Sequence, residues 1–167
     1  MKEVNVIKNF TIALADKNNE NEVVNVLNEV TLNLLEKEIN QWEYPWDKNE
    51  IKKEIEGKRI FVVFDDNNQI IATFSIKNID ENLWVKNDSK DNLYLYRIAV
   101  LPQFQGMYIG EQIAEYVFNI AKTLNKRFYL DCWAGNEKLK KFYSTVGFCY
   151  VGDYSEGNYI ISVFSYE

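Results

Sequence analysis

The sequence predicts a single α/β domain in which a mixed, twisted β-sheet is flanked by helices. Apolar runs of strand length, such as Ile60–Phe64 and Leu93–Leu101, alternate with segments whose apolar residues recur at helical spacing. With 167 residues, 47% of them hydrophobic, the chain fits one domain with a substantial core. No repeat or linker divides it, so we expect residues 1–167 to follow the order β-α-α-β-β-β-α-β-α-β-β.

The first third of the chain is predicted to form one strand and two helices. The strand is Phe10–Ala15, and helical spacing of valines and leucines predicts a helix over Glu22–Ile39. Residues 41–47 form an aromatic loop that proline interrupts. A short helix over Lys48–Glu56 is expected to end at Gly57.

A hairpin is predicted next, followed by the strand that organises the rest of the chain. Ile60–Phe64 is continuously apolar, and Gln69–Lys77 alternates apolar with polar residues after a polar turn. Residues 79–92, which include Trp84, read as a surface connection. Leu93–Leu101 is then a buried strand, which ends where Pro102 lacks an N–H for the ladder.

A loop with glycines four residues apart joins this strand to a helix. The loop spans Gln105–Gly110, and helical spacing of apolar residues predicts a helix over Ile109–Leu124 with one apolar face. A turn of this kind aims the free amides of the first helical turn at an anion, and the helix dipole favours phosphate there. Two glycines alone are equally compatible with a plain turn.

The last third is predicted to add one short helix and three strands. Asn136 is placed to cap the helix, and Gly147 is placed to end it. A turn is expected at residues 155–158. The predicted strands are Arg127–Trp133, Phe148–Val151 and Tyr159–Phe164.

The amino-acid composition argues against several kinds of partner and excludes several catalytic mechanisms. The net charge of −6 argues against a nucleic-acid partner, and no apolar stretch is long enough to suggest a membrane partner. The chain has no histidine, which excludes Ser–His–Asp and Cys–His nucleophiles and every His-ligated metal, so no metal site is predicted. Cys132 and Cys149 read as small buried hydrophobes, which fits a reducing, cytoplasmic location.

Three motifs then resemble one family. They are Ile98–Pro102 (IAVLP), Gln105–Gly110 (QGMYIG), and the pair Leu130–Asn136 (LDCWAGN) and Phe142–Phe148 (FYSTVGF). In this order and spacing they resemble the GNAT family of acetyl-coenzyme A-dependent N-acetyltransferases, over essentially the whole chain. The resemblance implies transfer of an acetyl group from acetyl-CoA to an amine, by direct attack in a ternary complex and without a covalent enzyme intermediate.

The resemblance also implies a set of cofactor-binding residues. In the family, the backbone of this strand binds the pantetheine arm, and Ile98 and Val100 match the strand positions that do so. An amide of the same strand stabilises the tetrahedral oxyanion. Asn136 resembles a cofactor-contacting asparagine. The loop positions that would cradle the pyrophosphate are Gln105, Gly106, Met107, Tyr108, Ile109, Gly110 and Glu111.

Tyr108 is the departure from the family pattern, because a glycine usually stands at this position. A Cβ and a large ring would hinder close approach of the backbone to the pyrophosphate if the residue were left-handed. If the residue were helical instead, tyrosine would be tolerated and the amides would stay available. We expect cofactor binding to be retained with altered contacts.

Tyr143 matches the tyrosine that the family uses as general acid toward the departing thiolate. A phenol stays protonated at neutral pH and can donate that proton. The alternative is a tyrosine that only packs on the apolar face of its helix. Cys132 is discounted as a nucleophile because no histidine is present to activate it.

The sequence defines the residues that would bind the acceptor amine less clearly. Aromatic faces attract ammonium groups, although rings more often pack in cores. The candidate aromatic residues are Trp42, Tyr44, Trp46, Tyr94 and Tyr96. No general base is identified; Glu43, Asp47 and Asp91 lie in segments expected near the acceptor, where surface carboxylates are the simpler interpretation.

We expect a small-molecule amine as the acceptor. A protein amino group is an open alternative, as is a non-catalytic coenzyme A-binding or regulatory module on the same fold. A homodimer is an expectation at the level of the family alone.

Overall fold

The computed structural model describes residues 10–79 and 92–166, in two compact units. The first unit holds residues up to Ile76 together with Arg97–Gly110, and the second holds Lys77–Tyr96 together with the chain from Glu111 onward. The predicted order of strands and helices is confirmed. Trp84 and Asp91 lie outside the described residues.

The described residues contain seven strands in one sheet, with the order β1-β2-β3-β4-β5-β7-β6. Strands β3 and β4 run through both units. The pairs β1–β2, β2–β3, β5–β7 and β6–β7 are antiparallel, whereas β4 and β5 are parallel, so the sheet is mixed as predicted. The strands are β1 (Thr11–Leu14), β2 (Ile60–Phe64), β3 (Ile70–Asn78), β4 (Leu93–Val100), β5 (Phe128–Trp133), β6 (Cys149–Glu156) and β7 (Tyr159–Tyr166).

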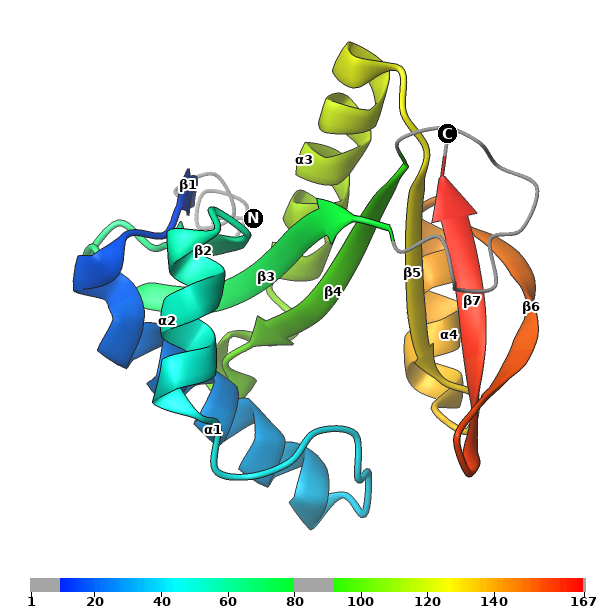
Figure 1. Cartoon of the computed structure of the whole chain (residues 1–167), viewed down its shortest axis with the longest axis horizontal. Coiled ribbons are helices and arrows are strands. Elements are labelled where there is room, and N and C mark those ends of the chain that lie inside the picture. The colour runs from blue at the N-terminus through cyan, green and yellow to red at the C-terminus, as the bar shows by residue number, and fades with distance from the viewer. Residues whose placement is uncertain (1–9, 80–91, 167) are drawn as a thin grey trace, which may run out of the picture. The chain divides into compact units, whose positions relative to one another are not determined.

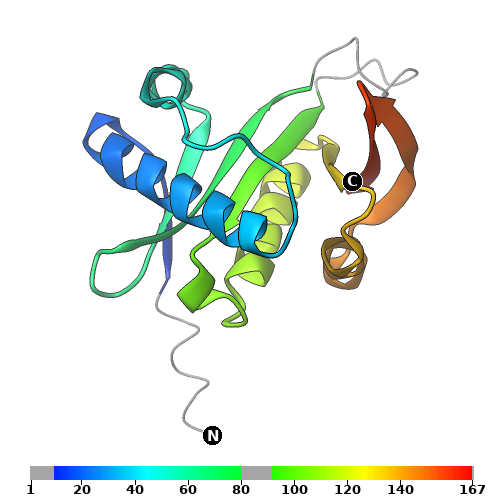
Figure 2. The ribbon, with the colours of Figure 1, turned by 90° about the horizontal axis from the view of Figure 1, so that it is seen from below.

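In the first unit, α1 (Glu20–Glu36) and α2 (Lys48–Glu56) lie on the same face of β2 and β3 (Figures 1 and 2). Their apolar sides bury Leu27 and Ile51 against strand residues such as Val62. Fully burying an aliphatic side chain of this size stabilises the fold by about 1.5–3 kcal/mol. Each helix therefore depends on the sheet for its stability.

Helix α1 ends at Glu36, three residues before the predicted end. Glu38 has a φ of 61°, and a left-handed residue stops the α-helical hydrogen-bond pattern. The amide of Ile39 returns instead to the carbonyl of Leu34 at 2.9 Å. The short helix α2 has the predicted bounds and is capped by the carboxylate of Asp47.

In the second unit, α3 (Ile109–Leu124) and α4 (Glu137–Val146) cover an aromatic core. Phe118 of α3 stacks on Tyr166 of β7, with ring centroids 3.8 Å apart. Figure 1 shows α4 behind the strands β5 and β7. Helix α4 begins at the cap Asn136 and ends at Gly147, whose φ of 127° suits glycine. Both termini were predicted.

Two predictions about the closing hairpin are wrong in detail. Strand β6 extends to Glu156, so the turn is reduced to Gly157 and Asn158. Gly157 adopts the positive φ (65°) that a two-residue hairpin turn requires. Cys149 is exposed rather than buried, because it lies on an outer strand of the sheet.

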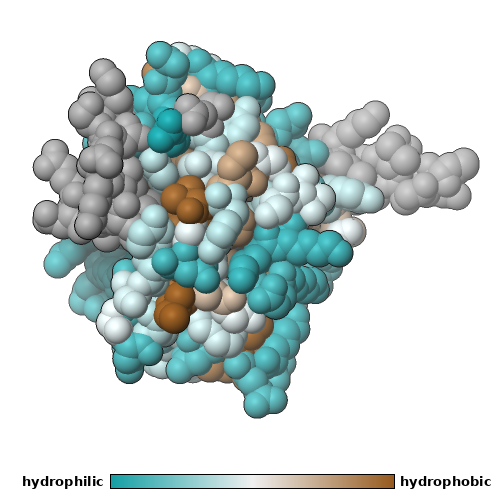
Figure 3. Space-filling view, turned by 90° about the vertical axis from the view of Figure 1, so that its right-hand side faces the viewer, coloured by the Kyte–Doolittle hydropathy of each residue, from teal (hydrophilic) through white to brown (hydrophobic). Residues whose placement is uncertain are grey.

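Apolar side chains are exposed singly on this hairpin. They include Tyr150, Val151, Tyr159 and Ile160. Figure 3 views the side on which β6 lies in Figure 1, and its brown residues are separated by teal and white ones. Scattered apolar residues of this kind are normal for a protein surface.

None of the helices within residues 10–79 and 92–166 is both long enough and apolar enough to span a lipid bilayer.

Candidate active site

The middle of β4 carries an unusual backbone conformation. Arg97 has a φ of 54°, which is rare for a residue with a side chain and interrupts regular pleating. Its guanidinium donates to Glu50 of α2 at 2.5 Å and lies 4.9 Å from the ring centroid of Trp46. These contacts anchor β4 to the helical layer of the first unit.

In the second unit, the parallel pairing of β4 with β5 is short. The ladder joins Leu93 to Phe128 and Tyr94 to Tyr129, at the beginning of both strands. Ile98 and Val100, beyond the ladder, are half-buried.

The loop after β4 is fastened back onto the strand by Gln105. Its side-chain amide donates to the carbonyl of Val100 at 3.0 Å. Gly106 follows with a φ of 81°, and a Cβ at this glycine would meet nothing within 4 Å. The backbone here is therefore open to a ligand.

Tyr108 is left-handed, with a φ of 68°, and its side chain is 54% exposed. The helical conformation that would have accommodated tyrosine easily is thus not adopted. Ile109, the next residue, is buried and begins α3. The strained tyrosine therefore sits at the junction between the loop and the helix.

The loop and the helix terminus fit a pyrophosphate group. The first amides of the 16-residue helix α3 have no partner within the helix, and the open space at Gly106 leaves the loop backbone accessible. Glu111, the acidic residue of the first turn, is exposed. These residues can hold the diphosphate of coenzyme A.

Replacing Tyr108 by glycine should raise the free energy of unfolding by about 1 kcal/mol, because a left-handed residue with a Cβ is strained. Urea denaturation measures this change. Met107→Gly is the matched control, which lacks the strain relief and should be less stable than the unmodified protein. The binding of coenzyme A, followed by calorimetry, should not weaken, since the loop amides remain. Equal or lower stability of Tyr108→Gly would contradict the strain.

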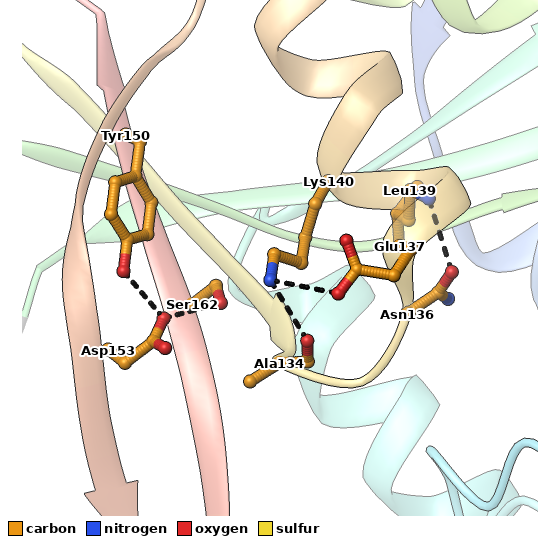
Figure 4. A network of polar contacts seen from close by, with 8 residues as sticks. All are labelled: Ala134, Asn136, Glu137, Leu139, Lys140, Tyr150, Asp153 and Ser162. Atoms are coloured by element: carbon orange, nitrogen blue, oxygen red, sulfur yellow. Dashed lines mark hydrogen bonds and ion pairs between the residues drawn. The ribbon is translucent and has the colours of Figure 1, made fainter.

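Asn136 acts as the cap of α4, at the end of the loop after β5. Its side-chain oxygen accepts the amide of Leu139 at 3.1 Å (Figure 4). Lys140 donates to the carbonyl of Ala134 at 3.1 Å and pairs with Glu137 at 3.4 Å. These bonds hold the β5–α4 loop, and with it the position of Asn136.

Tyr143, on the same helix, is buried among aromatic rings. Its ring centroid lies 5.6 Å from that of Phe164 and 5.9 Å from that of Phe148. Burial, together with nearby Cys132 and Asp131, raises the pKa of Tyr143. The phenol is therefore protonated throughout the physiological pH range. Within the described part of the second unit, no hydrogen bond engages its hydroxyl.

The sequence did not predict a second pair of proton-bearing groups, which is half-buried in this unit. The hydroxyl of Tyr94 on β4 donates to the carboxylate of Asp131 on β5 at 2.6 Å. Burial raises the pKa of Tyr94, and Asp131 adds to that rise. Burial also raises the pKa of Asp131, and Glu156 contributes, although the bond from Tyr94 opposes the rise.

Cys132, the residue that follows Asp131, is inert. Burial raises the pKa of its thiol to about 12, and the Asp131 carboxylate adds to the rise. A thiol in this environment is not ionised at neutral pH and is a poor nucleophile. The structure therefore agrees with setting Cys132 aside.

The predicted acceptor aromatics fall into two groups. In the first unit, Trp42 and Trp46 pack against the core, and the indole N–H of Trp46 donates to Thr31 at 2.9 Å. Tyr44 is 48% exposed. In the second unit, Tyr94 and Tyr96 stack on each other, with centroids 5.3 Å apart.

Of the candidate bases, Glu43 is exposed and Asp47 is occupied in capping α2. Asp91 lies outside the described residues. Across residues 10–79 and 92–166, no group of three or more His, Cys, Asp or Glu side chains is placed to hold a metal ion.

Comparison with known sequences identifies the class. The profile of the acetyltransferase (GNAT) family matches residues 28–148, well over half of the chain. The chain belongs to this family. The predicted enzyme class, N-acetyltransferase, and the predicted donor, acetyl-CoA, are thereby confirmed.

Individual relatives agree with this assignment. The uncharacterized N-acetyltransferase YesJ of Bacillus subtilis is 26% identical over 129 residues, which cover 72% of this chain and 71% of YesJ. A GNAT-family acetyltransferase from Listeria monocytogenes superposes with a TM-score of 0.79 at 20% identity, over 95% of this chain and 94% of that protein. The protein yncA from Salmonella typhimurium, whose structure was solved with its cofactor acetyl-CoA, gives a TM-score of 0.68 at 14% identity, covering 96% and 94% of the two chains. The likenesses to these two structures show the fold.

Proposed function

We propose that this protein transfers the acetyl group of acetyl-CoA to the primary amine of a small molecule, by direct attack of the amine. The observation that carries the proposal is a pair of proton-bearing groups in the second unit, one buried and one half-buried. One is a phenol held protonated, Tyr143, and the other is a carboxylate whose pKa is raised, Asp131. A reaction that removes a proton from an amine and delivers one to a leaving thiolate needs both kinds of group.

The loop and strand residues are proposed to bind the donor. The backbone of Gly106–Glu111 and the amides at the start of α3 would hold the pyrophosphate, with Gln105 positioning the loop through Val100. Backbone groups of Ile98 and Val100 would hold the pantetheine arm, and Asn136 would add a contact from the start of α4. When bound, acetyl-CoA supplies an activated acyl group and a thiolate leaving group.

Tyr143 is proposed as the general acid. Its hydroxyl carries a proton at every pH where the protein is expected to work, and no bond within its unit diverts that proton. The raised pKa makes it a weaker acid than a free phenol. Proton donation would therefore accompany departure of the thiolate rather than precede it.

Asp131 is proposed as the group that receives the amine proton. One oxygen, Oδ2, accepts from Tyr94, which fixes the orientation of the carboxylate. The other oxygen has no hydrogen-bond partner in the described part of the chain. Burial raises the pKa of Asp131, which strengthens it as a base.

The proposal can be tested by incubating the protein with acetyl-CoA and a panel of amines. The release of coenzyme A and the mass of the product are measured in parallel. We expect acetylated small amines to form with acetyl-CoA as donor. Binding of acetyl-CoA without turnover of any amine, peptide or protein would favour a non-catalytic module. Acetylation of protein amino groups alone would move the acceptor to a protein.

A further inference from the structure

A cation lies on the two tyrosines of β4. The ammonium of Lys77, near the end of β3, is 4.8 Å from the ring centroid of Tyr96 and 5.8 Å from that of Tyr94. The two rings are nearly parallel, with an interplanar angle of 6°. The aromatic faces that the sequence suggested for an amine are therefore already occupied by a positive charge of the protein itself.

Lys77 lacks the carboxylate partner that two other half-buried cations among the described residues have. Arg97 pairs with Glu50, and Lys140 pairs with Glu137. Lys77 is half-buried, yet it forms no salt bridge with any residue in the described ranges. Attraction to the aromatic faces offsets part of the desolvation of the ammonium. The cation is thus available to an anionic group that enters from outside.

Tyr94 connects this cation to the proposed base. Its ring faces Lys77, while its hydroxyl donates to Asp131. The protein therefore holds a cation over the ring of this side chain and a carboxylate at its hydroxyl end. Glu156, which raises the pKa of Asp131, adds negative potential at the Asp131 end.

We propose that the acceptor is a zwitterion, an amine that carries a carboxylate or similar anionic group a few bonds away. The anionic group would pair with Lys77, and the amine would be directed to Asp131. This inference rests on the proposed function and narrows it from amines in general to amino acid-like molecules. Two fixed opposite charges would also select against amines without an anionic group, because Lys77 would then stay unpaired.

The test compares acceptors that differ only in the anionic group, with Lys77→Gln as the variant. The probes are an α-amino acid and the amine obtained by removing its carboxylate, each assayed for kcat/KM and, with coenzyme A present, for binding by calorimetry. We expect the unmodified protein to favour the amino acid by about tenfold to a hundredfold, the worth of a hydrogen bond to a charged group. Lys77→Gln should lose that preference through a fall in kcat/KM for the amino acid, while Lys77→Arg should keep the preference.

The control is Lys122→Gln, which removes an exposed lysine of the same unit and should behave like the unmodified protein. Equal binding of both probes by the unmodified protein, or a preference that survives in Lys77→Gln, would overturn the inference. Failure of the proposed function looks different. It would abolish turnover of every acceptor, while the calorimetric comparison would still report whether Lys77 recognises the carboxylate.

Discussion

Replacing Tyr143 by phenylalanine is expected to lower kcat about a hundredfold or more, the usual contribution of a positioned general acid. The substitution removes only the hydroxyl oxygen and keeps the ring in its aromatic cluster. The ring contacts with Phe148 and Phe164 do not involve the hydroxyl, so the fold should be retained. The dissociation constant of coenzyme A, measured by calorimetry, should change little, because the loop amides that we propose as its binding site are untouched.

A matched control is Tyr154→Phe, which removes a hydroxyl from a half-buried tyrosine of β6 in the same unit. We expect its kcat to stay near that of the unmodified protein. The raised pKa of Tyr143 adds a second criterion. In the unmodified protein, deprotonation of Tyr143 should cause no loss of activity at moderately alkaline pH, because the phenol keeps its proton there. Unchanged turnover of Tyr143→Phe would remove Tyr143 as the acid.

Local sequence signals were sufficient for the order of the elements and for the ends of α2 and α4. The Asn136 cap and the Gly147 terminus of α4 each depend on a residue whose own chemistry favours that position. The Gly57 terminus of α2 was predicted for the same reason, whereas its Asp47 cap was not. Apolar periodicity over a few turns carries enough information for such elements.

Backbone geometry at single residues was not available from the sequence. Arg97 and Tyr108 are both left-handed, a conformation that their side chains disfavour. Tertiary contacts hold Arg97 there, through Glu50 and Trp46. No local sequence pattern marks such positions, so the sequence alone could not show whether Tyr108 is helical or left-handed.

The pairing of Tyr94 with Asp131 was missed for a related reason. The two residues are 37 positions apart, and only the parallel register of β4 with β5 brings them into contact. In the sequence, Asp131 is one polar residue within an otherwise apolar strand. That placement was the available signal, since a carboxylate on a buried strand needs a partner or a function.

Replacing Asp131 by asparagine is expected to lower kcat/KM about a hundredfold at pH values above the raised pKa of the carboxyl group. The amide keeps the shape and can still accept the bond from Tyr94, but it cannot take a proton from the amine. In the unmodified protein, kcat/KM should rise as pH increases through that pKa, because Asp131 becomes a base on losing its proton. The pH profile of the variant should lack this limb.

Measuring the stability of Asp131→Asn distinguishes its loss of activity from a loss of folded protein. The pKa of Asp131 is higher in the folded than in the unfolded chain, so the folded state binds the proton more tightly. Ionisation therefore destabilises the unmodified protein as pH rises from the ordinary Asp value through the raised one. Since asparagine does not ionise, the stability of the variant relative to the unmodified protein should improve over that same interval, while its activity falls. The control is Asp153→Asn on β6, where bonds from Ser162 and Tyr150 lower the pKa of an exposed carboxyl group (Figure 4). The Asp153→Asn variant should still show the rise of kcat/KM with pH. If Asp131→Asn also showed this rise, the base would be another group.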